Sequence, residues 1–203
     1  MFLKKILPIF SYIFHPIFIP ILGSIFYVHY SENYFAKDHY LLLLFQVVII
    51  TFLLPLSFFY LLKTIGKVDT IMLSDTSQRK MPLLLQLVLT AVLLQKSVTI
   101  DRFFELYFFF LAGLISVLIA FVLLFAKVKA SIHMIGMSTF TFFVIGISLQ
   151  NALNLNYLIA LLFLVTGLIA SSRLQLQAHS IKELIWGYCI GMIPQIGLWW
   201  FWL

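Results

Sequence analysis

Long runs of apolar residues, with charges gathered between them, constrain the fold of this chain more than any other feature. Hydrophobic residues make up 63% of its 203 residues and charged residues only 10%, and the mean hydropathy is +1.10. Soluble globular domains have about 45–50% apolar and about 25% charged residues, so a soluble core of this size could not bury so much apolar surface. We therefore expect an integral membrane protein.

The apolar runs predict membrane-spanning helices. A hydrocarbon core about 30 Å thick takes roughly 20 helical residues to cross. The runs between charges give seven candidates, at about 9–30, 39–62, 82–95, 103–126, 134–150, 156–171 and 184–203. The third is short, because about 14 residues rise only about 21 Å. We expect an all-α, polytopic membrane bundle of six to seven spans, forming a single domain over residues 1–203.

Features inside the spans fit packing and anchoring. The basic start of the chain is not followed by a small-residue cleavage site, so the first run is expected to be a retained span. Pro16 and Pro20 are expected to kink it. Gly187-x-x-x-Gly191 is expected to let another helix approach closely. The histidines outside the motifs described below are expected to pack at the membrane interface; they are His15, His29 and His39.

Positive charges are distributed unevenly between the two faces that seven crossings would create. The N-terminus and loops 63–81, 127–133 and 172–183 would share one face, and loops 31–38, 96–102 and 151–155 the other. Ten of the 13 Lys and Arg residues lie on the first face. The positive-inside rule would make that face cytoplasmic, whereas an anion-binding site would explain the same excess. The net charge of +6 is scattered over loop ends, where it meets lipid head groups, so no nucleic-acid partner is expected.

Two clusters of ionisable residues lie on this first face. His179 and Glu183 are four residues apart, which places them on one side of a helix, and the carboxylate can hold one ring nitrogen while the other attacks. Lys129, Ser131 and His133 add a cation, a hydroxyl and a second imidazole. Two histidines and several cations suit in-line phosphoryl transfer. The histidines and the single cysteine lack the spacing of a zinc site, so no metal is expected.

The clusters resemble the three motif segments of the type-2 phosphatidic acid phosphatase superfamily, the lipid phosphate phosphatases related to vanadium haloperoxidases. The family's third segment, Ser-Arg, five residues, His, three residues, Asp, corresponds to Ser172-Arg173 through His179 to Glu183, with Glu for Asp. Its second, Pro-Ser-Gly-His, corresponds to Ala130-Ser131-Ile132-His133. Its first, Lys, six residues, Arg-Pro, is represented by Arg79, with Met72 in place of Lys and Pro82 displaced by two residues. The resemblance covers about residues 63–191.

The resemblance implies an acid phosphatase/haloperoxidase-like core and a two-step mechanism without metal or other cofactor. His179 would attack phosphorus to form a phosphohistidine, with Glu183 orienting its ring. His133 would protonate the departing oxygen and then activate water. The phosphate would be held by Arg79, Lys129, Ser131, Ser172 and Arg173. The expected substrate is a lipid phosphomonoester or an isoprenyl diphosphate.

Two other functions fit the same residues. An alcohol in place of water would make the protein a lipid phosphotransferase, and a degenerate site would belong to a non-catalytic small transporter or lipid-binding protein. The expected location is the bacterial inner membrane, with a membrane lipid as partner. Family members commonly act at the outer face on lipid carriers recycled for the cell wall, such as undecaprenyl carriers, whereas the charge count favours the cytoplasmic face.

Overall fold

The computed structural model describes residues 2–30, 37–69 and 77–203, and the side chains of 7–30, 39–69 and 78–203. The secondary structure of these residues is entirely helical. In chain order the elements are α1 (Phe2–Ile13), η1 (Pro16–Phe18), α2 (Ile19–Tyr30), α3 (Lys37–Val48), η2 (Ile49–Leu53), α4 (Leu54–Thr64), η3 (Ser77–Arg79), α5 (Lys80–Lys96), α6 (Phe104–Phe125), α7 (Ile132–Gln150), α8 (Asn156–Gln175) and α9 (Ile181–Trp202).

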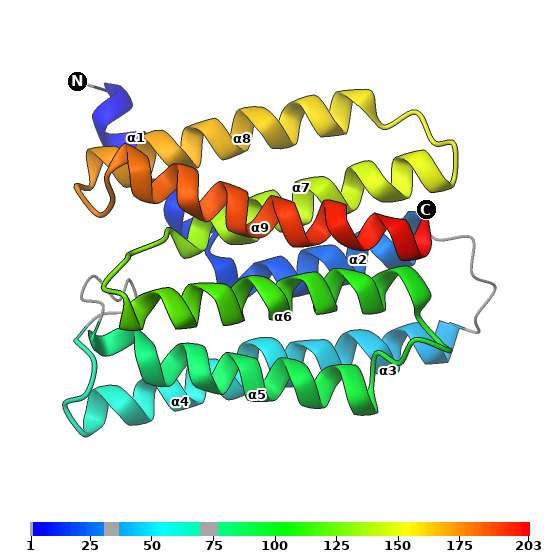
Figure 1. Ribbon diagram of the computed structural model, residues 1–203, viewed down its shortest axis with the longest axis horizontal. Helices are drawn as coiled ribbons and strands as arrows, with labels where there is room; N and C mark the ends of the chain where they lie inside the picture. Colours follow the sequence, from blue (N-terminus) through cyan, green and yellow to red (C-terminus); the bar gives the residue numbers. More distant parts are fainter. Residues whose placement is uncertain (1, 31–36, 70–76) are drawn as a thin grey trace.

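The long helices of the bundle lie side by side along one axis and alternate in direction (Figure 1). α3, the π-helical η2 and α4 form one continuous helical segment. The connections α4–α5, α6–α7 and α8–α9 gather at one end of the bundle together with α1, and the α7–α8 connection and the C-terminus lie at the other. We call the end that holds α1 the basic end, because ten of the 13 Lys and Arg residues belong to its segments.

Six helical segments are long and apolar enough to cross a membrane: Leu7–Tyr30, His39–Thr64, Phe104–Phe125, Ile132–Gln150, Asn156–Gln175 and Ile181–Trp202. α5 is shorter, with 17 residues, but it is longer than the run 82–95 and rises about 26 Å beside α6 (Figure 1). The prediction of an all-helical, multi-pass membrane protein with six to seven spans is confirmed.

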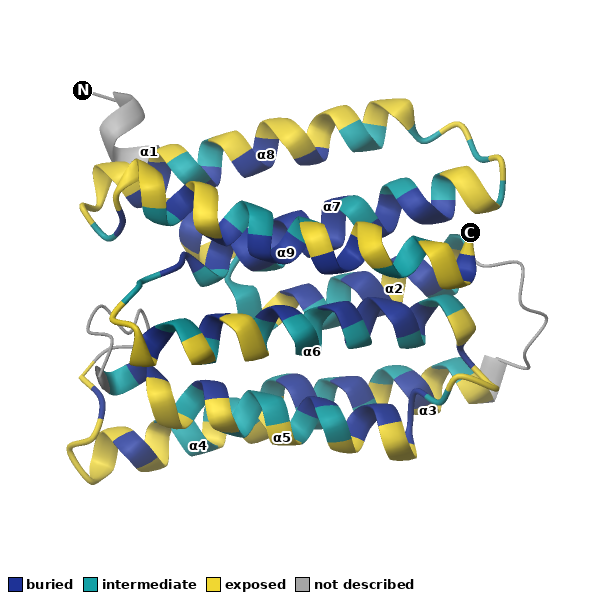
Figure 2. Cartoon of the chain, in the orientation of Figure 1, coloured by how far each residue is buried: buried dark blue, intermediate teal, exposed yellow. Residues whose placement is uncertain are grey.

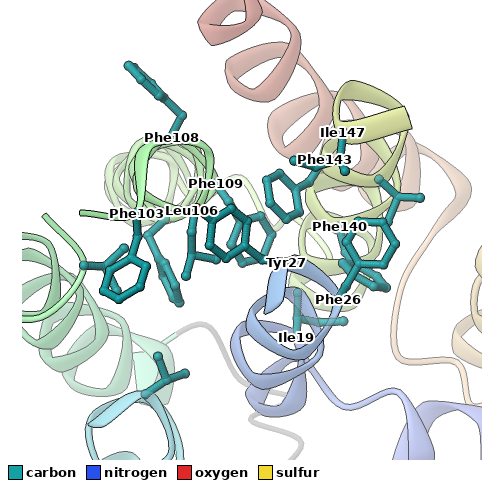
Figure 3. Packing of buried hydrophobic residues seen from close by; sticks show 14 of the residues in the cluster. Ile19, Phe26, Tyr27, Phe103, Leu106, Phe108, Phe109, Phe140, Phe143 and Ile147 are labelled. Atoms are coloured by element: carbon teal, nitrogen blue, oxygen red, sulfur yellow. The ribbon is translucent and has the colours of Figure 1, made fainter. Parts of the chain in front are cut away.

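Aromatic side chains fill the space between α2, α6 and α7 (Figure 3). The rings of Phe109 and Phe143 have centroids 4.6 Å apart, and Phe26 meets Phe143 edge-on at 6.2 Å. The fully buried Tyr27 donates its hydroxyl hydrogen to Oε2 of Glu105 at 3.0 Å. Each aromatic pair, such as Phe109 with Phe143, stabilises the packing by about 0.5–1.5 kcal/mol beyond the burial of its surface. These pairs matter here because lipid tails are as apolar as the side chains, so helix association depends on packing.

The first span is broken just before Pro16, one of the two prolines expected to kink it, whereas Pro20 lies in the first turn of α2. α1 ends at Ile13, Pro16 begins the short η1, and α2 continues from Ile19. The side chain of His15 caps η1 by accepting a hydrogen bond from the amide of Ile17 at 3.3 Å. α1 packs against α8 and is turned away from the axis that α2 follows (Figure 1). This break places α1 at the basic end of the bundle.

α7 is the central helix, and α9 packs directly on it. In its most apolar window, 72% of α7 is buried, compared with 17–39% for the other candidate spans (Figure 2). A Cβ on Gly187 would lie 2.5 Å from the carbonyl oxygen of Ser131, and one on Gly191 would overlap the carbonyl of Ile135. The prediction that these two glycines allow a close helix approach is confirmed.

The α7–α9 contact can be tested with two glycines of the same helix. Gly191→Ala should lower the thermal midpoint in detergent, because the new methyl group overlaps backbone atoms of α7. Overpacking costs about 1–3 kcal/mol, which corresponds to roughly 3–10 °C for a chain of this size. The control is Gly197→Ala, where a Cβ meets no atom within 4 Å, so its midpoint should stay or rise. Equal midpoints for both variants would contradict the close approach.

Candidate functional site

The residues predicted to form the site all lie at the basic end, although three separate stretches of the chain supply them: residue 79, residues 129–133 and residues 172–183. Arg79 is the N-cap of α5, Lys129 lies in the α6–α7 connection, Ser131 and His133 begin α7, Ser172 and Arg173 lie in the last turn of α8, His179 lies in the α8–α9 connection, and Glu183 lies in the first turn of α9. Met72, the position that corresponds to the family's first-segment lysine, lies outside the described residues.

Three hydrogen bonds to main-chain oxygens tie these segments together. The amide of Ser131 donates to the carbonyl of Glu183 at 3.1 Å. Nζ of Lys129 donates to the carbonyl of Ala178 at 2.8 Å. Nη1 of Arg79 donates to the carbonyl of Ala130 at 3.1 Å. The start of α7 and the α8–α9 connection are therefore fixed to each other, and α5 is fixed to the start of α7.

The predicted pair of His179 and Glu183 forms, with Nδ1 of the ring 2.8 Å from Oε2 of the carboxylate. The sequence predicted that both residues lie on one side of a helix. In the structure His179 lies before α9, so the two residues do not belong to the same helix. A capping box produces the pair: Oγ of Ser180 accepts from the amide of Glu183 at 3.4 Å, and the amide of Ser180 donates to the same carboxylate at 3.3 Å. When Nδ1 carries the hydrogen that Glu183 accepts, the lone pair of a neutral ring is on Nε2.

Burial keeps the His179 ring neutral. The side chain is buried, and this burial, followed by the positive charges of Arg79, Lys129 and Arg173, lowers the pKa of His179 from 6.5 to about 3. A neighbouring carboxylate ordinarily raises the pKa of a histidine. Here burial and the three cations lower the pKa of His179 despite the carboxylate of Glu183. At neutral pH, Nε2 of His179 is therefore an unprotonated nitrogen close to three positive charges.

The second predicted histidine is held by the first span. Nε2 of His133 lies 3.0 Å from the carbonyl oxygen of Ser11, to which it donates, so a proton can be exchanged at Nδ1. The ring of His15 stands edge-on to that of His133, with centroids 5.3 Å apart and an interplanar angle of 84°. His133 is close enough to Arg173 for its charge to act on the His133 ring, and close enough to His179 for the two rings to interact when they are protonated. The two predicted histidines therefore belong to one cluster.

Sequence reasoning missed the contribution of the first span. The hydroxyl groups of Ser11 and Ser172 are 2.6 Å apart and both residues are fully buried. The prediction that His15 packs at the membrane interface is wrong, because the break before Pro16 turns its ring onto His133 inside the bundle. The available signal was a histidine followed by proline in the middle of an apolar run.

The N-terminus of α7 carries a buried hydroxyl group without a hydrogen-bond partner among the described residues. Ser131 is the N-cap of this 19-residue helix, but its side chain makes no capping bond, and its Oγ is fully buried. Helix N-termini attract anions, because their first amides point outward and the helix dipole is positive there. With Arg173 only 2% exposed and Arg79 only 3%, this end of α7 has the donors and charges that an oxyanion needs.

No family model, no curated protein and no solved structure matches this chain.

The neutral state of His179 predicts how stability changes with pH. Between pH 3 and 6.5 the unfolded chain binds a proton at this histidine that the folded protein does not bind. The free energy of unfolding should therefore fall as the pH drops below 6.5, by up to about 1.4 kcal/mol per pH unit. His179→Gln removes this titration. Between pH 7 and 5, the wild type should lose up to about 2 kcal/mol relative to the variant, measured as thermal midpoints in detergent. Parallel pH profiles would show that His179 is not held neutral.

Proposed function

We propose that this protein is a membrane phosphatase that hydrolyses a lipid phosphomonoester or an isoprenyl diphosphate through a phosphohistidine. One observation carries the proposal: the buried, neutral ring of His179, oriented by Glu183, lies close to three cations and to a second histidine. A nucleophile with a fixed lone pair, an oxyanion site and a proton donor are the parts that phosphoryl transfer needs.

In the first step, Nε2 of His179 attacks phosphorus while the bond from phosphorus to the lipid oxygen breaks. The negative charge of the bound phosphate favours a protonated His133. Because Nε2 of this ring donates to Ser11, His133 gives the lipid oxygen the proton on Nδ1. Arg79, Lys129 and Arg173 stabilise the equatorial oxygens, where negative charge is spread in the transition state. The lipid alcohol leaves and the phosphate is bound to His179.

In the second step, His133 removes a proton from water, and the oxygen attacks phosphorus as the bond to His179 breaks. Inorganic phosphate leaves, and both histidines return to their starting forms. Glu183 holds the His179 ring in the same orientation through both steps. The proposed core is of the acid phosphatase/haloperoxidase type, and the proposed location is the bacterial inner membrane.

Activity without metal is the direct test. The purified protein should release phosphate from a lipid monophosphate or a prenyl diphosphate in EDTA. His179→Gln should lower kcat by roughly 10⁴-fold or more, as loss of a nucleophile does, and His133→Gln by about 10²–10⁴-fold. His29→Gln is the matched control, because His29 is exposed on α2 away from the site.

Three outcomes separate the alternatives. Full activity in His179→Gln would reject this nucleophile. Phosphate or vanadate binding without turnover would make the protein a lipid-binding protein or transporter instead. Transfer of the phosphoryl group to an added alcohol in preference to water would make it a phosphotransferase.

A further inference from the structure

A cavity of about 220 Å³ opens beside the histidine cluster. Its walls come from the break in the first span and from η2, α4, α5, α6 and α7. The wall residues of α5 run from Pro82 in the first turn to Thr90 near the middle of the helix, a distance of about 12 Å along the axis. The cavity therefore leads from the basic end toward the middle of the bundle.

The end of this cavity nearest the basic end adjoins the site. His15 and Ile132 line it. The His15 ring is edge-on to that of His133, and Ile132 precedes His133 in the first turn of α7. The cavity and the proposed proton donor are therefore separated by no more than one side chain.

The wall suits hydrocarbon rather than a polar ligand. Its threonine and glutamine side chains make hydrogen bonds within the protein: Thr51 to the carbonyl of Val47, Thr139 to that of Gly191, and Gln86 to Thr90. The rest of the lining is mostly aliphatic, aromatic, proline and glycine. Cavities with such a lining bind apolar molecules.

We propose that this cavity binds a single hydrocarbon chain of the lipid phosphate substrate. The inference rests on the proposed function, because in that mechanism His133 protonates the oxygen that carries the chain. That oxygen lies on the side of His133, and so does the cavity. The phosphate stays at the basic end while the chain extends toward the middle of the bilayer, which is how an amphiphile is oriented in a membrane.

The size of the cavity narrows the substrate class. A cavity of about 150 Å³ holds a molecule of six carbons, so about 220 Å³ holds roughly nine carbons of one chain. This volume corresponds to a segment of one chain, and a second acyl chain would lie outside the cavity. The substrate class is therefore a lipid phosphate with one slim chain next to the phosphate, such as an isoprenyl phosphate or a single-chain lipid, and not a diacyl lipid with both chains inside the bundle.

Gly113 of α6 offers a way to fill the cavity without moving its walls. It lines the cavity, and a Cβ at this position would meet no atom within 4 Å. Gly113→Phe should therefore occupy the space meant for the chain. Gly167 of α8 is the matched control: it too lies mid-helix with no atom within 4 Å of an added Cβ, and it is exposed outside the cavity.

The experiment compares kcat/KM for ethyl phosphate and octyl phosphate in EDTA. Burying a methylene group is worth about a fourfold factor, so in the wild type the octyl ester should be favoured strongly. Gly113→Phe should lower this octyl-to-ethyl ratio by roughly 10- to 100-fold, because the ring displaces several methylene groups. Gly167→Phe should keep the wild-type ratio. Equal ratios in the two variants would overturn the chain-binding cavity and leave the phosphatase proposal standing.

A second readout does not depend on turnover. An octyl phosphate with a diazirine at the end of its chain should label wall residues of α5, α6 and α7 after irradiation, in the wild type and in Gly167→Phe but not in Gly113→Phe. If the wild type hydrolyses neither ester but shows this labelling, the phosphatase proposal fails and the cavity stands as a lipid-chain site. Labelling confined to the outer surface would overturn the cavity proposal whatever the activity.

Discussion

The close approach of α7 and α9 is the contact on which the rest of the basic end depends. Gly187 and Gly191 leave no Cβ between the helices, so the amide of Ser131 can reach the carbonyl of Glu183. That hydrogen bond sets the distance between the first turn of α7, which carries His133, and the capping box that orients His179. A side chain at Gly187 would press on the backbone of Ser131, and one at Gly191 on the carbonyl of Ile135, so either would separate the two histidine segments.

Burying cations at a membrane surface is costly, and hydrogen bonds to main-chain oxygens offset part of this cost. Charged groups lose hydration there and are kept mainly where they serve a function. Arg79 and Lys129 use their N–H donors partly on carbonyl oxygens of the connections, which also fixes those connections. A carbonyl dipole does not neutralise a cation, whereas a bound phosphate would. Burial first, and then the charges of Arg79, Lys129 and Arg173, keep His179 deprotonated.

The distribution of charges along the sequence predicted the spans and the end of the bundle where the site residues gather. It did not predict which helices touch, because spans that are apolar all around give no face to identify. The ends of α5 were misplaced, since Lys80 and Lys96 lie within the helix rather than beyond it, and Nζ of Lys80 rests 5.1 Å from the Phe125 ring. Ser11 was missed because a single hydroxyl in an apolar run does not indicate its partner.

The break in the first span joins the two halves of the proposed substrate site. In a continuous helix, residues 11–15 would lie along the same axis as α2. The turn at Pro16 instead lets α1 pack against α8 while α2 packs against α7. Ser11 then holds His133, and His15 forms both a wall of the cavity and a neighbour of that ring. Because one turn positions both groups, the same few residues would place the reacting oxygen of the proposed substrate and the chain that it carries. A change in this turn would therefore alter the proposed proton donor and the proposed chain site together.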